Sequence, residues 1–346
     1  MPRICNSCVL PDTFPGIILG EDGSCQFCRK HASSGQSAAD KERYRAKFQN
    51  LIEKVKQARV RRAIGVYDVL MAYSGGKDST YTLQVLVNDF SLKVLAVTFN
   101  HGCVSPRAVE NIEAVTGQLG VDHMMLTPSR KSLWPAFRRS VTEDVYPMKA
   151  LERASAICNT CMNVAKSLFL RQAVQMEIPL MAYGWSPGQA PVSSSVMKMN
   201  PALMRRTQAL SADSLGRLMG DEAGAFLLSE RDFEHFEKLA SRTDEIFFYN
   251  VHPLAFREYS EERIVEEIKK LGWVSPSDTD ANSSNCLLNG FANSIHLQRY
   301  GFHPYAFEIA GLVREGCMTR EAGLAKLAEM PNESIMRDVI DKLEIK

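Results

Sequence analysis

A short glycine-rich segment, Ser74-Gly75-Gly76-Lys77-Asp78-Ser79, follows an apolar run and precedes a helix-like stretch at 80–90. Two adjacent glycines allow a tight turn whose backbone N–H groups curl around an anion, and a helix that begins there adds the positive end of its dipole. Such a strand–turn–helix unit predicts a site for a phosphate or pyrophosphate group. The segment matches neither the P-loop pattern nor the dinucleotide-binding glycine pattern.

Apolar runs alternate with helix-like stretches from residue 68 onward, and the runs lie at 68–73, 93–100, 122–128, 178–185 and 245–251. This alternation is typical of βαβ units, and it predicts an α/β fold with a doubly wound parallel sheet. The segment 190–244 interrupts the alternation and predicts a mainly helical insertion. The strongly charged segment 38–62 predicts a solvated amphipathic helix.

The side chains of the glycine-rich segment suit reactions of phosphate groups. Lys77 would offset the charge that develops on a leaving pyrophosphate, and the hydroxyls of Ser74 and Ser79 can bond to phosphate oxygens. Asp78 would either help to bind Mg²⁺ or cap the helix that follows.

The segment SGGKDS directly after a first strand resembles the PP-loop of the ATP pyrophosphatase superfamily, over roughly residues 68–290. The resemblance implies the PP-loop fold, ATP and Mg²⁺ as ligands, and cleavage of ATP to AMP and pyrophosphate as a carbonyl-type oxygen becomes adenylated. It also implies that Thr98, Phe99 and Asn100 hold adenine and ribose. Gly184, after the fourth strand, would belong to the same nucleotide site.

A second resemblance rests on CNSCVLPDTFPGI near the start, the loop SGGKDSTY, the C-x-x-C pair of Cys158 and Cys161, and the segment MTREAGLAKL at 318–327. These segments are similar to the N-acetyl sugar amidotransferase group. That resemblance implies transfer of ammonia to an activated acetamido sugar, with the ammonia supplied by a separate glutaminase subunit.

Six of the nine cysteines occur in three C-x-x-C pairs, which in a reducing compartment indicate metal or redox sites before disulfides. Cys5, Cys8, Cys25 and Cys28 have the spacing C-x2-C-x16-C-x2-C, which predicts a zinc ribbon over residues 1–35. Four protein ligands leave no open position on Zn²⁺, so we expect this site to be structural.

Cys158 and Cys161 share one face of a predicted helix, and Cys286 follows the late helix of the sheet. Three thiolates can hold a [4Fe-4S] cluster with one iron open, and the pattern resembles PP-loop enzymes that thiolate tRNA. Three other interpretations stay open. They are a zinc site completed by His303, a persulfide on Cys158 or Cys286, and three unconnected buried thiols.

The favoured hypothesis is an enzyme that adenylates its substrate with ATP and then transfers sulfur, with Lys77, Asp78, Cys158, Cys161 and Cys286 as catalytic residues. Ammonia transfer is the alternative, and a non-catalytic zinc and nucleotide-binding module is the second alternative. Expected partners are a small-molecule or tRNA substrate, a sulfur donor or glutaminase subunit, and a second copy in a homodimer.

The predicted organisation is a zinc ribbon at 1–35, a linker helix at 36–66, a PP-loop domain at 67–290 and a helical tail at 291–346. The formal net charge is +1, which argues against an extended basic surface for nucleic acid but not against a local patch. No apolar run reaches the length of a membrane span, and the first residues lack the apolar stretch of a secretory signal, so we expect a cytoplasmic protein without membrane contact.

Overall fold

The computed structural model describes residues 2–33, 37–61, 64–242, 246–280 and 282–345. Its centre is a six-stranded sheet in the order β3-β2-β1-β4-β6-β5. The strands are β1 (Val69–Ala72), β2 (Val94–Phe99), β3 (Asp122–Leu126), β4 (Leu180–Tyr183), β5 (Val196–Lys198) and β6 (Tyr249–Val251). All pairings are parallel except that of the edge strand β5 with β6. The predicted doubly wound α/β class is confirmed.

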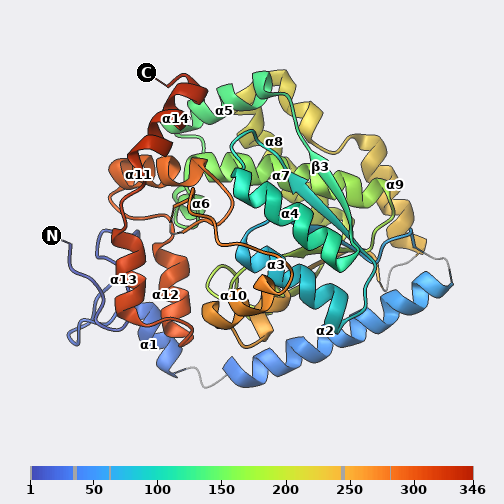
Figure 1. The fold of residues 1–346 in the computed structure, drawn as a ribbon, viewed down its shortest axis with the longest axis horizontal. Helices are drawn as coiled ribbons and strands as arrows, with labels where there is room; N and C mark the ends of the chain where they lie inside the picture. The colour runs from blue at the N-terminus through green and yellow to red at the C-terminus, as the bar shows by residue number, and fades with distance from the viewer. Residues whose placement is uncertain (1, 34–36, 62–63, 243–245, 281, 346) are drawn as a thin grey trace.

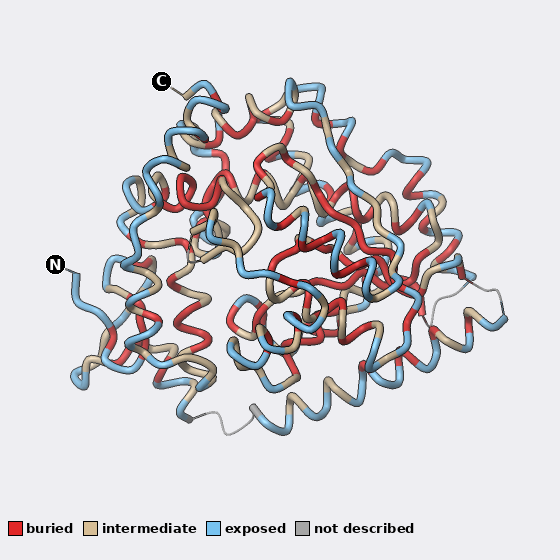
Figure 2. Tube along the Cα trace, viewed as in Figure 1, coloured by how far each residue is buried: buried red, intermediate tan, exposed pale blue. Residues whose placement is uncertain are grey.

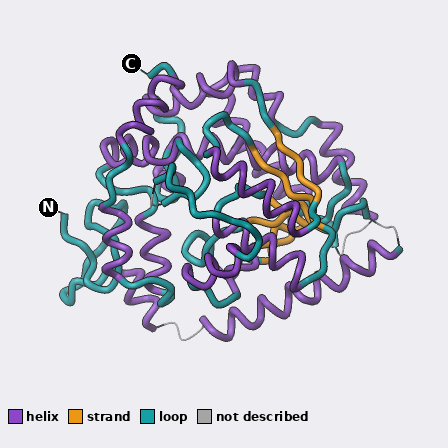
Figure 3. Tube along the Cα trace, in the orientation of Figure 1, coloured by secondary structure: helices purple, strands orange, loops and turns teal. Residues whose placement is uncertain are grey.

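Helices surround the sheet (Figures 1 and 3). Those of the first half of the chain are α1 (Gln26–Ser33), α2 (Ser37–Val60), α3 (Lys77–Gln84), the π-helix η1 (Val85–Asp89), α4 (Pro106–Leu119), α5 (Arg130–Thr142), α6 (Met148–Leu151) and α7 (Ala156–Gln175). Those of the second half are η2 (Val192–Ser194), α8 (Pro201–Met219), η3 (Gly220–Phe226), α9 (Glu230–Arg242), η4 (Pro253–Phe256), α10 (Glu261–Lys269), α11 (Leu288–Tyr300), α12 (Ala306–Arg314), α13 (Arg320–Ala328) and α14 (Glu333–Leu343).

The central strands are buried (Figure 2). Successive side chains of a strand point to opposite faces of the sheet, and helices cover both faces. Leu70 belongs to an apolar cluster with α5, α7, α8 and α9, whereas Val69 and Met71 belong to a cluster with α2, α3, α4 and α10. The near-continuous apolar runs in the sequence are the direct result of this two-sided burial.

Each predicted strand has an observed counterpart, although residue 245 of the last predicted run lies outside the described residues. The predicted domain limits at 35–36 and 244 also fall outside the described residues, and they stay predictions. The insertion is mainly helical but contains β5, which the sequence analysis did not anticipate. Three residues of strand are too short to produce a recognisable alternation.

The N-terminal cysteine module and the C-terminal helices share one apolar cluster. Phe302, Ala306 and Ile309 pack with the four N-terminal cysteines and with Phe14. Figure 1 shows the first residues of the chain beside α12 and α13. The two ends of the chain therefore stabilise one another, a contact between distant segments that the sequence analysis did not predict.

No helix within the described ranges is long and apolar enough to cross a membrane.

Candidate functional site

The glycine-rich loop connects β1 to α3 at the point where the strand order reverses. β2 and β3 lie on one side of β1 and β4 lies on the other, and such switch points are the usual ligand sites of doubly wound sheets. Gly75 has a φ of +75°, and a Cβ there would lie 2.7 Å from the carbonyl oxygen of Ala108, so this position needs glycine. The predicted strand–loop–helix unit is present.

Two backbone N–H groups of the loop donate to hydroxyls. The N–H of Gly76 donates to Ser74 Oγ over 3.3 Å, and the N–H of Lys77 donates to Ser284 Oγ over 3.0 Å. A phosphate oxygen would have to take the place of these hydroxyls. Ser284 lies two residues before Cys286, so the loop and the third predicted cysteine are connected through one short segment.

Gly184, at the end of β4, lies against the beginning of α3. A Cβ at this position would come within 2.4 Å of the Cα of Ser79 and 2.6 Å of its backbone nitrogen. Glycine therefore allows the chain at the end of β4 to approach the start of α3 closely.

Lys77 and Asp78 face a cavity of about 400 Å³ between the loop and the C-terminal helices. Lys77 Nζ donates to Asp78 Oδ1 and to the hydroxyl of Tyr259, each over 2.9 Å. Burial alone would lower the pKa of Lys77, but the carboxylates of Asp78 and Glu261 outweigh it and raise the pKa. Lys77 therefore keeps its positive charge beside the loop, as an electrostatic role toward pyrophosphate requires.

A second cavity of about 340 Å³ joins the loop to the cysteines. Its lining includes residues of the loop, of the ends of β2 and β4, and all three cysteines: Ser74, Ser79, Thr98, Phe99, Gly184, Cys158, Cys161 and Cys286. Asn100, which the resemblance placed in the nucleotide site, does not line it, and its Oδ1 accepts the N–H of Gly102 over 3.0 Å. Ser283, Tyr305 and Glu308 line both cavities, so the two spaces adjoin.

Local structure brings the three cysteines to this cavity. Ser155 caps α7 by accepting the N–H of Cys158 over 3.2 Å, so that Cys158 and Cys161 lie in the first turns of the helix. Cys286 is held by an isolated antiparallel bridge to Val104 and by the N–H of Leu287, which donates to the carbonyl of Cys103 over 3.0 Å. All three thiols are free and half-buried.

The three thiols influence one another electrostatically. Burial, followed by the neighbouring thiols of Cys286 and Cys158, raises the pKa of Cys161. Burial and the Cys158 thiol likewise raise the pKa of Cys286. A bound metal would reverse this balance by favouring the thiolate forms, and three soft sulfur donors suit an iron–sulfur cluster. Within the described residues these three sulfurs do not gather within 4.8 Å of one another, as the ligands of a single zinc ion would.

His101 is a cavity residue that no sequence motif singled out. It is 5% exposed, and its Nε2 lies 3.7 Å from Cys286 Sγ. Burial lowers the pKa of His101 to about 4. His303, the fourth zinc ligand of one interpretation, does not line the cavity, and its Nδ1 accepts the N–H of Tyr305.

Further polar groups line the cavity. Lys166 lies over the ring of Trp185, with Nζ 4.9 Å from the ring centroid, and among the described ion pairs none involves Lys166 or Arg153. Burial raises the pKa of Glu308 to about 7, although the hydroxyl of Ser186 donates to it over 2.8 Å. The cavity thus combines two cations with a carboxyl group that titrates near neutrality.

The four N-terminal cysteines form a compact group. Their sulfur atoms all lie within 4.8 Å of one another, close enough to hold one metal ion, and all four residues are buried. The N–H of Cys25 donates to Cys5 Sγ over 3.1 Å, and the guanidinium of Arg320 donates to the carbonyls of Cys5 and Cys8. Among the described residues, no other group of three or more such ligands is so tightly gathered.

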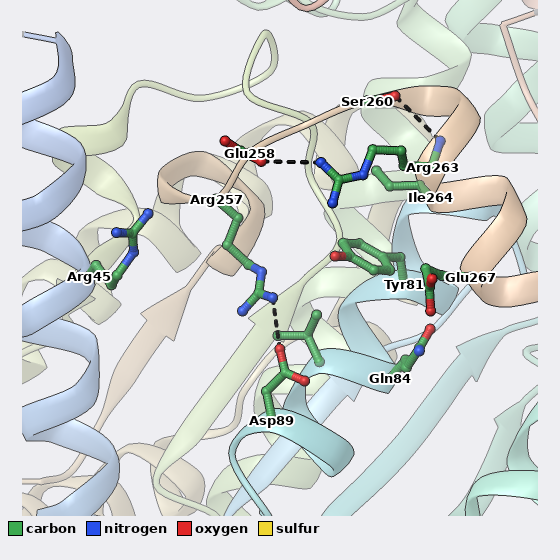
Figure 4. Close-up of a pocket in the computed structure, with 11 residues that line it drawn as sticks. Arg45, Tyr81, Gln84, Asp89, Arg257, Glu258, Ser260, Arg263, Ile264 and Glu267 are labelled. Carbon is green, nitrogen blue, oxygen red and sulfur yellow. Dashed lines mark hydrogen bonds and ion pairs between the residues drawn. The ribbon is translucent and has the colours of Figure 1, made fainter.

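A third cavity, of about 450 Å³, opens between α2, α3 with η1, and α10 (Figure 4). Its arginines are paired: Arg257 with Asp89 over 2.7 Å and Arg263 with Glu258 over 3.2 Å. Neither the glycine-rich loop nor any cysteine lines it. Because its charges are compensated, this cavity has no excess charge to select an ionic ligand.

Comparisons with known proteins find likenesses both in sequence and in structure. No protein-family model matches the chain. The chain is 25% identical over 263 residues, 76% of its own length and 73% of the other, to the uncharacterized protein MJ1599 of Methanocaldococcus jannaschii.

Two proteins are among the solved structures that resemble the chain. One is a U34-tRNA thiolase, NcsA, from Methanococcus maripaludis with its [4Fe-4S] cluster, at 14% identity and a TM-score of 0.34, over 100% of this chain and 90% of the other. The second is a predicted subunit of a tRNA methyltransferase from Methanocaldococcus jannaschii, at 20% identity and a TM-score of 0.27, over 53% of this chain and 92% of the other. Scores this low assign no activity. The mostly parallel, doubly wound sheet and the loop after β1 nevertheless agree with the fold that the resemblance to the PP-loop superfamily implies.

Proposed function

We propose that this chain is an ATP-dependent enzyme that adenylates a carbonyl or amide oxygen of its substrate and then replaces that oxygen with sulfur. One observation carries the proposal: a single cavity is lined both by the glycine-rich loop, through Ser74 and Ser79, and by three free cysteines. Adenylation and transfer to the same carbon require two kinds of chemistry in one space. The shared cavity supplies that proximity.

In the first step the substrate oxygen attacks the α-phosphate of ATP, and the bond to pyrophosphate breaks. The backbone N–H groups of Gly76 and Lys77 are positioned to hold phosphate oxygens once the hydroxyls of Ser74 and Ser284 give way. The ammonium of Lys77 would offset the charge that grows on the leaving pyrophosphate. Asp78, bonded to Lys77 and Tyr259, orients that ammonium and could also ligate Mg²⁺.

In the second step a sulfide equivalent from a separate donor attacks the carbon that carries AMP, and the bond from carbon to the AMP oxygen breaks. Neither carbon nor sulfur changes its oxidation state. Cys158, Cys161 and Cys286 are the residues that would hold a [4Fe-4S] cluster. Such a cluster supplies an iron without a protein ligand, at which sulfide can be carried.

The cations of the cavity support an anionic substrate. Lys166 and Arg153 face the space without an ion-pair partner among the described residues, and a substrate phosphate would provide one. Both an RNA such as tRNA and a nucleotide-linked small molecule fit this requirement. The sulfur donor and a homodimer stay predictions.

The N-terminal cysteines support a separate Zn²⁺ site. Four thiols within 4.8 Å match the tetrahedral four-sulfur coordination of structural zinc, which leaves no position for a substrate. We therefore assign Cys5, Cys8, Cys25 and Cys28 a role in holding the N-terminal module against α12 and α13.

Ammonia transfer is the competing function, and one observation favours it. The N-terminal motif and the segment 318–327, which carry the resemblance to N-acetyl sugar amidotransferases, contact each other through Arg320 and the carbonyls of Cys5 and Cys8. Segments far apart in the sequence thus form one unit, as shared ancestry with that group would predict.

The test begins with anaerobically purified full-length protein. We expect bound iron and acid-labile sulfide in addition to zinc, and a tRNA-dependent formation of AMP and pyrophosphate. Release of ADP and phosphate would contradict the assignment of the loop. Zinc without iron, together with ammonium-dependent turnover of an activated acetamido sugar, would replace sulfur transfer by amidation.

A further inference from the structure

The imidazole of His101 is fixed in an apolar wall of the cavity. The residue follows β2 in the chain, and the backbone carbonyl of His101 accepts the indole N–H of Trp134 over 3.0 Å. Its ring lies 6.1 Å from the ring of Phe99 and 6.4 Å from that of Phe137, measured between centroids. These contacts hold the ring in place without satisfying either ring nitrogen.

The two ring nitrogens differ sharply in their surroundings. Nε2 lies 3.7 Å from Cys286 Sγ, whereas Nδ1 is buried and has no hydrogen-bond partner among the described residues. A proton on Nδ1 would be a buried donor without an acceptor and would carry its full desolvation cost, whereas a proton on Nε2 has the sulfur as its acceptor. The ring proton is therefore assigned to Nε2, where it points at the sulfur.

We propose that His101 is a positioning residue that donates its Nε2–H to the thiolate of Cys286 when that sulfur ligates a metal centre. The inference rests on the proposed function for the identity of the centre, but the hydrogen bond itself is a property of this chain. A hydrogen bond to a ligating sulfur withdraws charge from it, which stabilises the more negative, reduced state of a cluster. His101 thereby raises the reduction potential and orients the only cysteine that comes from outside α7.

The backbone explains why this pair is specific to Cys286. The bridge between Val104 and Cys286 and the bond from Leu287 to Cys103 join the segment after β2 to the segment before α11. His101 and Cys286 therefore belong to the same small tertiary unit. Cys158 and Cys161 enter the cavity from the first turns of α7.

The test compares the anaerobically reconstituted wild type with His101→Phe, which keeps a ring but removes the donor, and His101→Gln, which restores an N–H. His235→Phe, on the exposed side of α9, is the matched control. We expect iron content and visible absorption to be retained in all four proteins. The reduction potential should fall in His101→Phe, return toward the wild-type value in His101→Gln and stay unchanged in His235→Phe.

If the wild type binds iron, two results would overturn the proposal while leaving sulfur transfer intact. An unchanged potential in His101→Phe would show that the contact does not act on the cluster. Loss of iron in His101→Phe to the level of Cys286→Ser would make His101 a ligand rather than a donor.

A second arm uses Co²⁺ as a probe, so that the proposal is tested even if the wild type holds no iron. The spectrum of the Cys286→Ser counterpart is subtracted from that of each protein. This subtraction cancels the absorption of cobalt at the N-terminal cysteines, which both proteins contain. We expect the sulfur-to-cobalt charge-transfer band to move to longer wavelength in His101→Phe. That shift without iron would support His101 as the donor and count against the cluster, whereas an unshifted band or no band from Cys286 would overturn the role of His101.

Discussion

The N-terminal cysteines and the cavity cysteines use the same C-x-x-C spacing in different surroundings. The first group supplies four buried sulfurs within 4.8 Å of one another, packed against Phe302 and Ile309. The second group supplies two sulfurs from α7 and a third from Cys286, and all three residues are half-buried beside the glycine-rich loop. A complete ligand set enclosed by apolar side chains suits a structural ion, whereas an incomplete set that faces an open cavity suits chemistry.

The largest effect should come from the cavity. Cys286→Ser should abolish iron binding and sulfur transfer, because two sulfurs from one helix turn cannot hold a cluster, while ATP binding changes by less than about twofold. Cys317→Ser is the matched control, since Cys317 lies outside the cavity and its thiol donates a hydrogen bond to the carbonyl of Glu315. Iron analysis and product formation measure the outcome. Sulfur transfer retained in Cys286→Ser would mean that the cavity cysteines are not catalytic and do not differ in role from the N-terminal group.

Cys25→Ser should have the next largest effect, and of a different kind. Loss of one thiolate removes the metal and with it the contact between the N-terminal module and α12, at a cost of about 4 kcal/mol or more of stability. Limited proteolysis should then cleave within residues 2–33 first. Iron in the cavity should be retained, and its loss would mean that the two cysteine groups are not independent.

Gly184→Ala tests whether the close approach of the residue after β4 to the start of α3 shapes the nucleotide site. Its Cβ would meet the Cα of Ser79 at 2.4 Å, which forces the start of α3 to move. We expect ATP to bind about tenfold more weakly, about 1.4 kcal/mol, with iron retained. Gly117→Ala in α4 is the control, because nothing lies within 4 Å of its Cβ and alanine favours a helix. Equal nucleotide affinity in both variants would show that the close approach is unimportant.

The smallest effect should come from Ser284→Ala. The variant removes the hydroxyl that now accepts the N–H of Lys77, so a phosphate no longer has to displace it. Calorimetry should show ATP affinity unchanged or raised by up to about threefold, since one neutral hydrogen bond contributes about 1 kcal/mol or less. Ser241→Ala, on the exposed surface of α9, is the control. Weaker ATP binding in Ser284→Ala would mean that the Ser284 hydroxyl helps to bind the phosphate rather than competing with it.

Local sequence patterns determined several features of this protein. The apolar runs indicated five strands because two-sided burial leaves a continuous apolar signature, and the glycine-rich segment indicated a strand–turn–helix unit because Gly75 must adopt a positive φ. The spacing of Cys5, Cys8, Cys25 and Cys28 indicated a four-thiol group because such ligands come from short loops. Each of these depends on residues close together in the chain.

Tertiary structure alone decided the rest. His101 became a buried partner of Cys286 only because the segment after β2 pairs with the segment before α11, 185 positions along the chain. Lys77 and the cavity cysteines face two adjoining spaces, and Glu308 reaches both from α12, which lies beyond the predicted PP-loop domain. The partners of a side chain across such distances depend on how helices and strands pack, and no local periodicity records that packing.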